Sequence, residues 1–100
     1  MTDNTMTCKR IADELAEISN DYESLIEYFD DALDIEYRTG ANKEYRSARI
    51  MITCGGPNIF IDTKTDSVEL YWGVDHVSYP LDSDTALLVD SLFRDYFEMC

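Results

Sequence analysis

Residues 45–63, YRSARIMITCGGPNIFIDT, contain two runs of alternating apolar and polar side chains around a Gly-Gly-Pro-Asn tetrapeptide. An alternation with a period of two is typical of a strand with one buried and one exposed face. Glycine tolerates positive φ angles and proline fixes its own φ, so this tetrapeptide is the strongest turn signal in the chain. The stretch predicts two neighbouring strands, over residues 45–54 and 58–63.

The same alternation divides the side chains of these strands between two faces of a sheet. We expect the face toward the core to hold Ala48, Ile50, Ile52, Cys54, Ile59 and Ile61. Arg49 and Thr53 belong to the opposite face, where Met51 and Phe60 would form an exposed apolar patch with Tyr71 from a later strand. Such a patch usually has a partner. The alternative is that these are the scattered apolar residues that any protein surface carries.

Three further strands are predicted outside this pair. Residues 33–38 alternate in the same way, with Leu33 as the first inward side chain, and a turn over 39–43 joins them to the strand at 45–54. Residues 68–72 place Val68, Leu70 and Trp72 on one face. The last strand, residues 76–80, ends at Pro80, which lacks an N–H donor and therefore suits a sheet edge.

Helical periodicity marks the N-terminal region. Apolar side chains recur there in steps of four and three, at Ile11, Leu15, Ile18, Tyr22, Leu25 and Phe29. The spacing predicts either one helix over about residues 8–32 or a helix pair that separates at Ser19-Asn20-Asp21, and we favour the pair, with Asn20 or Asp21 as the second N-cap. We expect Thr7 to cap the first helix and residues 1–6 to fray.

A closing helix is predicted from Asp82 or Ser83 as N-cap, with Asp84 in its first turn. Helices at both ends of a meander can lie on one face of an antiparallel sheet. The sequence therefore predicts a single acidic α+β domain over residues 1–100. It comprises an N-terminal helix or helix pair, a four- to five-stranded antiparallel meander and a C-terminal helix, with the helices on one sheet face.

The charge is strongly negative, at -13 over 100 residues. Residues 13–36, DELAEISNDYESLIEYFDDALDIE, contain ten carboxylates and no Lys or Arg, and we expect no Lys partner at i,i+4 to relieve their repulsion. A surface of this sign repels nucleic acid and anionic membranes and attracts basic proteins. No apolar run approaches the roughly 20 residues of a membrane span and no signal core opens the chain, so a cytoplasmic location is expected.

Signatures of catalysis are missing from the sequence. His76 is the single histidine, and Cys8, Cys54 and Cys100 are widely spaced, which suits reduced thiols better than disulfides or a zinc site. The glycines of CGGPN precede a strand, whereas a phosphate-binding loop precedes a helix. We expect no enzyme activity, no metal and no cofactor.

The acidic helical region is the best candidate for a functional surface. Side chains three or four residues apart on a helix lie about 5–6 Å from each other, which resembles the regular spacing of phosphates along a nucleic-acid strand. The candidate partner-binding residues are Asp13, Glu14, Glu17, Asp21, Glu23, Glu27, Asp30 and Asp31, with Asp82 and Asp84 in a second patch. Two alternatives stay open, an ordinary solvated face and a binder of some other basic protein.

Residues 25–98 resemble small acidic proteins encoded by phages and mobile elements of gut bacteria. The shared features are an LDIEY strand, a CGGPNI-x-IDT turn and strand, a YWG strand end and a closing LDSD helix. By analogy of size and charge, the resemblance extends to anti-CRISPR and anti-restriction proteins that imitate DNA. It implies an inhibitor, active in the bacterial cytoplasm, whose partner is a basic nucleic-acid-binding protein such as a CRISPR effector or restriction complex. A homodimeric adaptor that pairs through the sheet face is the alternative.

Overall fold

The computed structural model describes residues 4–99 of the chain, which form three helices and five strands. The elements follow in the order α1 (Asn4–Ile18), α2 (Tyr22–Phe29), β1 (Asp34–Thr39), β2 (Tyr45–Thr53), β3 (Asn58–Asp62), β4 (Ser67–Trp72), β5 (Asp75–Pro80) and α3 (Ser83–Met99). The strands pair antiparallel in the order β1-β2-β3-β4-β5, so each strand neighbours the next in sequence. The predicted α+β fold with an antiparallel meander is confirmed, as is the place of β5 at a sheet edge.

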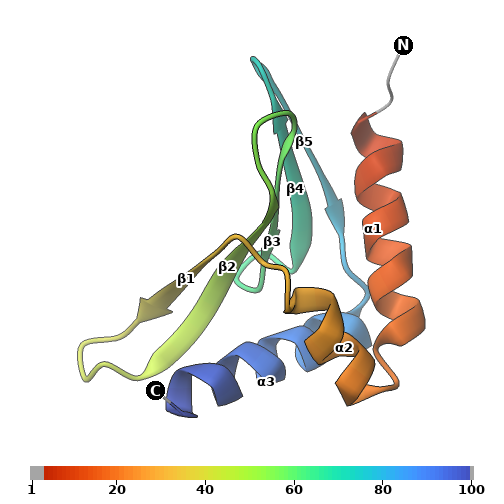
Figure 1. Cartoon of the computed structure of the whole chain (residues 1–100). Coiled ribbons are helices and arrows are strands. Elements are labelled where there is room, and N and C mark those ends of the chain that lie inside the picture. The colour runs from red at the N-terminus through yellow and green to blue at the C-terminus, as the bar shows by residue number, and fades with distance from the viewer. Residues whose placement is uncertain (1–3, 100) are drawn as a thin grey trace.

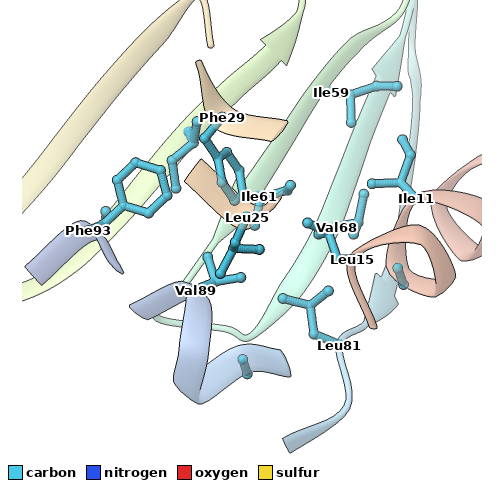
Figure 2. Packing of buried hydrophobic residues seen from close by; sticks show 14 of the residues in the cluster. Ile11, Leu15, Leu25, Phe29, Ile59, Ile61, Val68, Leu81, Val89 and Phe93 are labelled. Carbon is cyan, nitrogen blue, oxygen red and sulfur yellow. The ribbon is translucent and has the colours of Figure 1, made fainter. Parts of the chain in front are cut away.

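The helices pack on one face of the twisted sheet (Figure 1). α1 contacts β4 and β5, whereas α3 contacts β2 at the other end of the sheet. Figure 2 shows Leu25 and Phe29 of α2 close to Phe93 and Val89 of α3, and the rings of Phe29 and Phe93 meet edge to face at 4.9 Å. Leu15 of α1 is also fully buried in this core. The opposite face of the sheet carries no helix from the described residues.

The N-terminal helical region is a pair of helices, as favoured from the sequence. Asp21 is the N-cap of α2, with an extended backbone and a side chain that accepts a hydrogen bond from the Glu23 N–H at 3.1 Å. The expected start of the first helix was wrong, because α1 begins at Asn4 and includes Thr7. Residues 4–6 are therefore helical, while the predicted fraying of residues 1–3 lies outside the described residues.

A β-bulge near the end of β2 overturns part of the face assignment. Met51 pairs with Phe60, but Thr53 pairs with Ile59, so one residue of β2 has no paired residue on β3. The extra residue shifts the alternation, and it brings Thr53 opposite the buried Ile59. Cys54 then follows the end of the strand and is exposed, not in the core as expected.

Two residues expected in the core, Leu33 and Trp72, are exposed because they lie at the limits of the sheet. Leu33 precedes β1 and is 58% exposed, although its N–H still donates to the Met51 carbonyl at 2.8 Å. Trp72 ends β4 and is 51% exposed. It pairs with Asp75 across the β4–β5 turn, and it lines a hollow beside the start of α1.

Candidate functional site

The charges of the chain are unevenly divided between helices and strands. Residues 4–31 and 82–99, which include all three helices, carry thirteen carboxylates and three cations, whereas residues 34–80 carry seven and five. The helical layer therefore holds most of the net negative charge. We use the term acidic surface for the predicted partner-binding carboxylates that are exposed and do not serve as N-caps. Its members are Asp13, Glu14, Glu17, Glu23, Glu27, Asp30, Asp31 and Asp84.

The α1 carboxylates of the acidic surface have partial neutralisation, contrary to the sequence expectation. Lys9 Nζ lies 2.8 Å from Asp13 Oδ2, and Arg10 Nη1 lies 3.6 Å from Glu14 Oε1. Both pairs have i,i+4 spacing, and their cations come from the residues that precede the acidic stretch 13–36. All four side chains are about half exposed or more, so solvent screens both pairs and they contribute little to stability. A competing cation from another molecule could therefore replace Lys9 or Arg10 at little cost.

The remaining carboxylates of the N-terminal pair are exposed and have no cationic partner within residues 4–99. They are Glu17 on α1, Glu23 and Glu27 on α2, and Asp30 and Asp31 after α2. Because the chain turns between α1 and α2, these carboxylates do not lie along one continuous helix. Asp21 differs from them, since both of its carboxylate oxygens accept hydrogen bonds, from the Glu23 N–H and the Ser24 hydroxyl. Its visible role is to cap α2.

The C-terminal patch divides in the same way between caps and free carboxylates. Asp82 accepts hydrogen bonds from the Thr85 N–H at 3.0 Å and the Thr85 hydroxyl at 2.8 Å, and these bonds hold its pKa below the usual value. Asp84 is exposed in the first turn of α3. Further along α3, Asp90 and Asp95 accept hydrogen bonds from the hydroxyls of Tyr45 at 2.7 Å and Tyr22 at 3.0 Å.

The fold brings carboxylates from different elements to shared hollows. Glu14 of α1 and Asp31 after α2 line one hollow, and Asp13 of α1 and Asp82 before α3 line another. Sequence spacing alone does not indicate either pairing, because the members are 17 and 69 residues apart. The first and second predicted patches are therefore neighbours around α1.

The outer sheet face places Met51, Phe60 and Tyr71 together, as predicted, but Arg49 covers part of the patch. Met51 pairs with Phe60 across the strands, and the rings of Phe60 and Tyr71 lie 5.8 Å apart. The Arg49 guanidinium lies 3.7 Å from the centre of the Phe60 ring. Arg49 also pairs with Glu69 at 3.4 Å. The face is thus half-buried and polar in part, and it is less apolar than the sequence indicates.

A buried ion pair anchors this face and was missed from the sequence. Arg38 donates two hydrogen bonds to Asp62, at 2.8 and 2.9 Å, and the Asp62 side chain is only 5% exposed. Burial alone would raise the pKa of Asp62, but the bonds from Arg38 and the Lys64 N–H outweigh it, so the pKa lies below the usual value. The alternation places all these side chains outward, but the contact depends on strand register, which the sequence leaves open.

Groups suited to catalysis are not assembled in the part of the chain that the structure describes. His76 stacks on Tyr71 at 4.3 Å, and Cys8 is buried while Cys54 is exposed. Residues 4–99 contain no cluster of three or more His, Cys, Asp or Glu side chains that could hold a metal ion. No helix of the described chain has the length and apolar character that a membrane span needs.

A scan against protein-family models and searches of curated proteins and solved structures gave no match.

Proposed function

We propose that this protein is a phage- or mobile-element-encoded, non-enzymatic inhibitor of a host defence nuclease complex, of the anti-CRISPR kind. It acts as an acidic DNA mimic that occupies a basic nucleic-acid-binding surface. Its partner is a CRISPR effector or restriction complex in the cytoplasm of a bacterial host. The protein itself binds neither nucleic acid nor membrane, because its charge repels both.

The concentration of unpartnered carboxylates on the helical layer is the observation that carries this proposal. Glu17, Glu23, Glu27, Asp30 and Asp31 are exposed and lack a cation within the described residues. A surface shaped for solubility alone would intersperse both signs. Basic clefts that bind phosphates gain affinity through counterion release, and a concentration of carboxylates offers them the same gain. The resemblance to phage-encoded acidic proteins supports the choice of a defence complex as the partner.

A homo-oligomeric adaptor that pairs through the outer sheet face is the second candidate. The observation in its favour is that Met51, Phe60 and Tyr71 gather on a face that no helix of the described chain covers. Arg49 reduces the apolar area that this face could bury. The acidic surface also adds like-charge repulsion to any pairing of two copies. We therefore rank the adaptor below the inhibitor.

Capture from bacterial lysate with a salt titration tests the proposal. The immobilised protein is expected to retain a basic nucleic-acid-binding protein, and its affinity should fall steeply with salt because charge pairing dominates. For about six charge contacts, the loss between 50 and 200 mM salt is about 1,000-fold. Retention that does not change over this range would contradict a nucleic-acid-like binding surface.

A further inference from the structure

A hollow of about 560 Å³ lies between the start of α1 and the loop that joins β2 to β3. A second hollow, of about 270 Å³, continues from it, because Arg10, Thr53 and Ile59 line both. We call the combined feature the Trp72 groove. Trp72 lies at one end of the groove, and Glu14 and Asp31 lie at the other.

Local backbone geometry creates the aromatic end of the groove. The bulge in β2 directs Thr53 to the Ile59 side of the sheet, and Gly55 and Gly56 have φ angles of 98° and 151°. Few side chains tolerate these angles. A Cβ on Gly56 would lie 3.4 Å from the Trp72 ring. The loop therefore approaches Trp72 closely, while about half of the indole remains exposed to a ligand.

The opposite end of the Trp72 groove is acidic. Glu14 and Asp31 line it beside Tyr28, whose pKa is raised to about 12 by burial and then by the Glu14 charge, so the hydroxyl remains a donor. Arg10 contacts Glu14 at 3.6 Å, but its side chain is mostly exposed. A cation from another molecule could take its place on Glu14 and gain Asp31 as a second carboxylate.

We propose that the Trp72 groove binds an extended segment of the basic partner, with an apolar side chain against Trp72 and a Lys or Arg side chain between Glu14 and Asp31. Charge complementarity selects this occupant, because a second copy of this chain would bring a net charge of -13 to an acidic groove. Tryptophan is enriched among the residues that contribute most of the binding energy at protein interfaces. This inference rests on the proposed function and deepens it. The acidic surface attracts basic proteins in general, and the groove selects among them.

Trp72 is the only tryptophan, so its fluorescence reports directly on the groove. The probes are synthetic peptides in which Leu and Arg are separated by zero to three glycines. At least one spacing is expected to shift the Trp72 emission to shorter wavelength, because the indole loses water. Peptides with Leu→Gly or Arg→Glu should lose the shift. Equal responses from these controls, or no response from any spacing at millimolar concentration, would overturn the inference.

Variants test the groove against the captured partner. Trp72→Ala is expected to weaken binding about 30-fold, as for a typical interface hot spot. Val74→Ala, the matched control, removes a fully exposed apolar side chain two residues away and should have no effect. Thermal melting of both variants checks that they remain folded. If Trp72→Ala binds with wild-type affinity, the groove is not the binding site, and the proposed function remains intact. If DNA cannot displace the partner from this protein, the proposed function is wrong.

The acidic end of the groove has its own matched pair of variants. Glu14→Gln with Asp31→Asn removes two charges from the groove, and Glu17→Gln with Glu23→Gln removes two from outside it. The groove pair should weaken binding at least tenfold more than the control pair. Equal losses would show that only total charge matters, and would overturn the proposed site. Trp72 emission that changes with protein concentration alone would assign the groove to a second copy instead.

Discussion

A variant with Glu17→Lys, Glu23→Lys, Glu27→Lys and Asp30→Lys is expected to lose its basic partner and remain folded. The four side chains are exposed and have no cationic partner in residues 4–99, so their reversal breaks no ion pair in the described structure. It places like charges opposite a basic cleft, which costs several kcal/mol. Affinity should fall by at least about 100-fold, as measured by retention of the captured partner.

The controls for this variant separate local charge from total charge. Asp34→Lys with Glu36→Lys changes the net charge as much as Glu23→Lys with Glu27→Lys, but on β1 rather than α2. Only the α2 pair should weaken binding strongly. Light scattering shows whether the proteins self-associate through the sheet face. Undiminished retention by the fourfold variant would rule out the acidic surface as the binding site.

The fourfold variant omits Asp21 and Asp82 because they cap α2 and α3. Removal of an N-cap destabilises its helix. A loss of binding after substitution of Asp21 or Asp82 would therefore not distinguish lost recognition from lost folding. Their bonds to backbone N–H groups also keep both carboxylates in place. The main role of Asp21 and Asp82 is to cap the helices, although both also add negative charge to the surface.

Arg38→Met is expected to destabilise the domain by about 3 kcal/mol, because it leaves the buried Asp62 carboxylate without its main partner. Arg49 Nε, 4.0 Å from Asp62, offers partial compensation. For a domain of this size, each kcal/mol shifts Tm by about 4 °C or more. Thermal melting at neutral pH should therefore show a fall of more than about 10 °C. Arg46→Met, which removes an exposed arginine paired with Glu44, should change Tm little.

The effect of Arg38→Met should depend on pH in a defined direction. The pKa of Asp62 is lower in the folded protein than its usual value. The ion pair therefore stabilises fully above the usual Asp pKa of about 3.9, and this contribution is lost as the pH falls through the folded pKa. Denaturant unfolding at neutral pH and near pH 3 should show a smaller difference between wild type and variant in acid. If the difference in the free energy of unfolding were the same at both pH values, the Arg38–Asp62 ion pair would not be its cause.

Sequence patterns predicted those parts of the fold that local chemistry controls. Period-two alternation located the strands and the polar break at Ser19-Asn20-Asp21 located the second helix. Of the two candidate caps for the closing helix, Asp82 and Ser83, it is Asp82 that accepts the capping bond. These features depend on contacts within a few residues. Local signals were sufficient to predict these features because the apolar periodicity and the turn residues indicate the same element boundaries.

Features that depend on register or position in the sheet could not be predicted in this way. One inserted residue in β2 reversed the expected positions of Thr53 and Cys54. The Arg38–Asp62 pair joins two strands through a register that alternation does not specify. Trp72 matched the core pattern but lies at a strand end, where little packs over it. The acidic residues were found from composition, but their division into caps and free carboxylates required coordinates.

Competition with DNA is the most direct measurement of the central claim. The partner retained by the immobilised protein is purified, and its binding is measured with increasing amounts of a duplex oligonucleotide. Mutually exclusive binding is expected, with DNA displacing the protein and the protein displacing DNA. A ternary complex, in which the partner holds DNA and this protein at undiminished affinity, would contradict the claim that the acidic surface occupies a nucleic-acid-binding site.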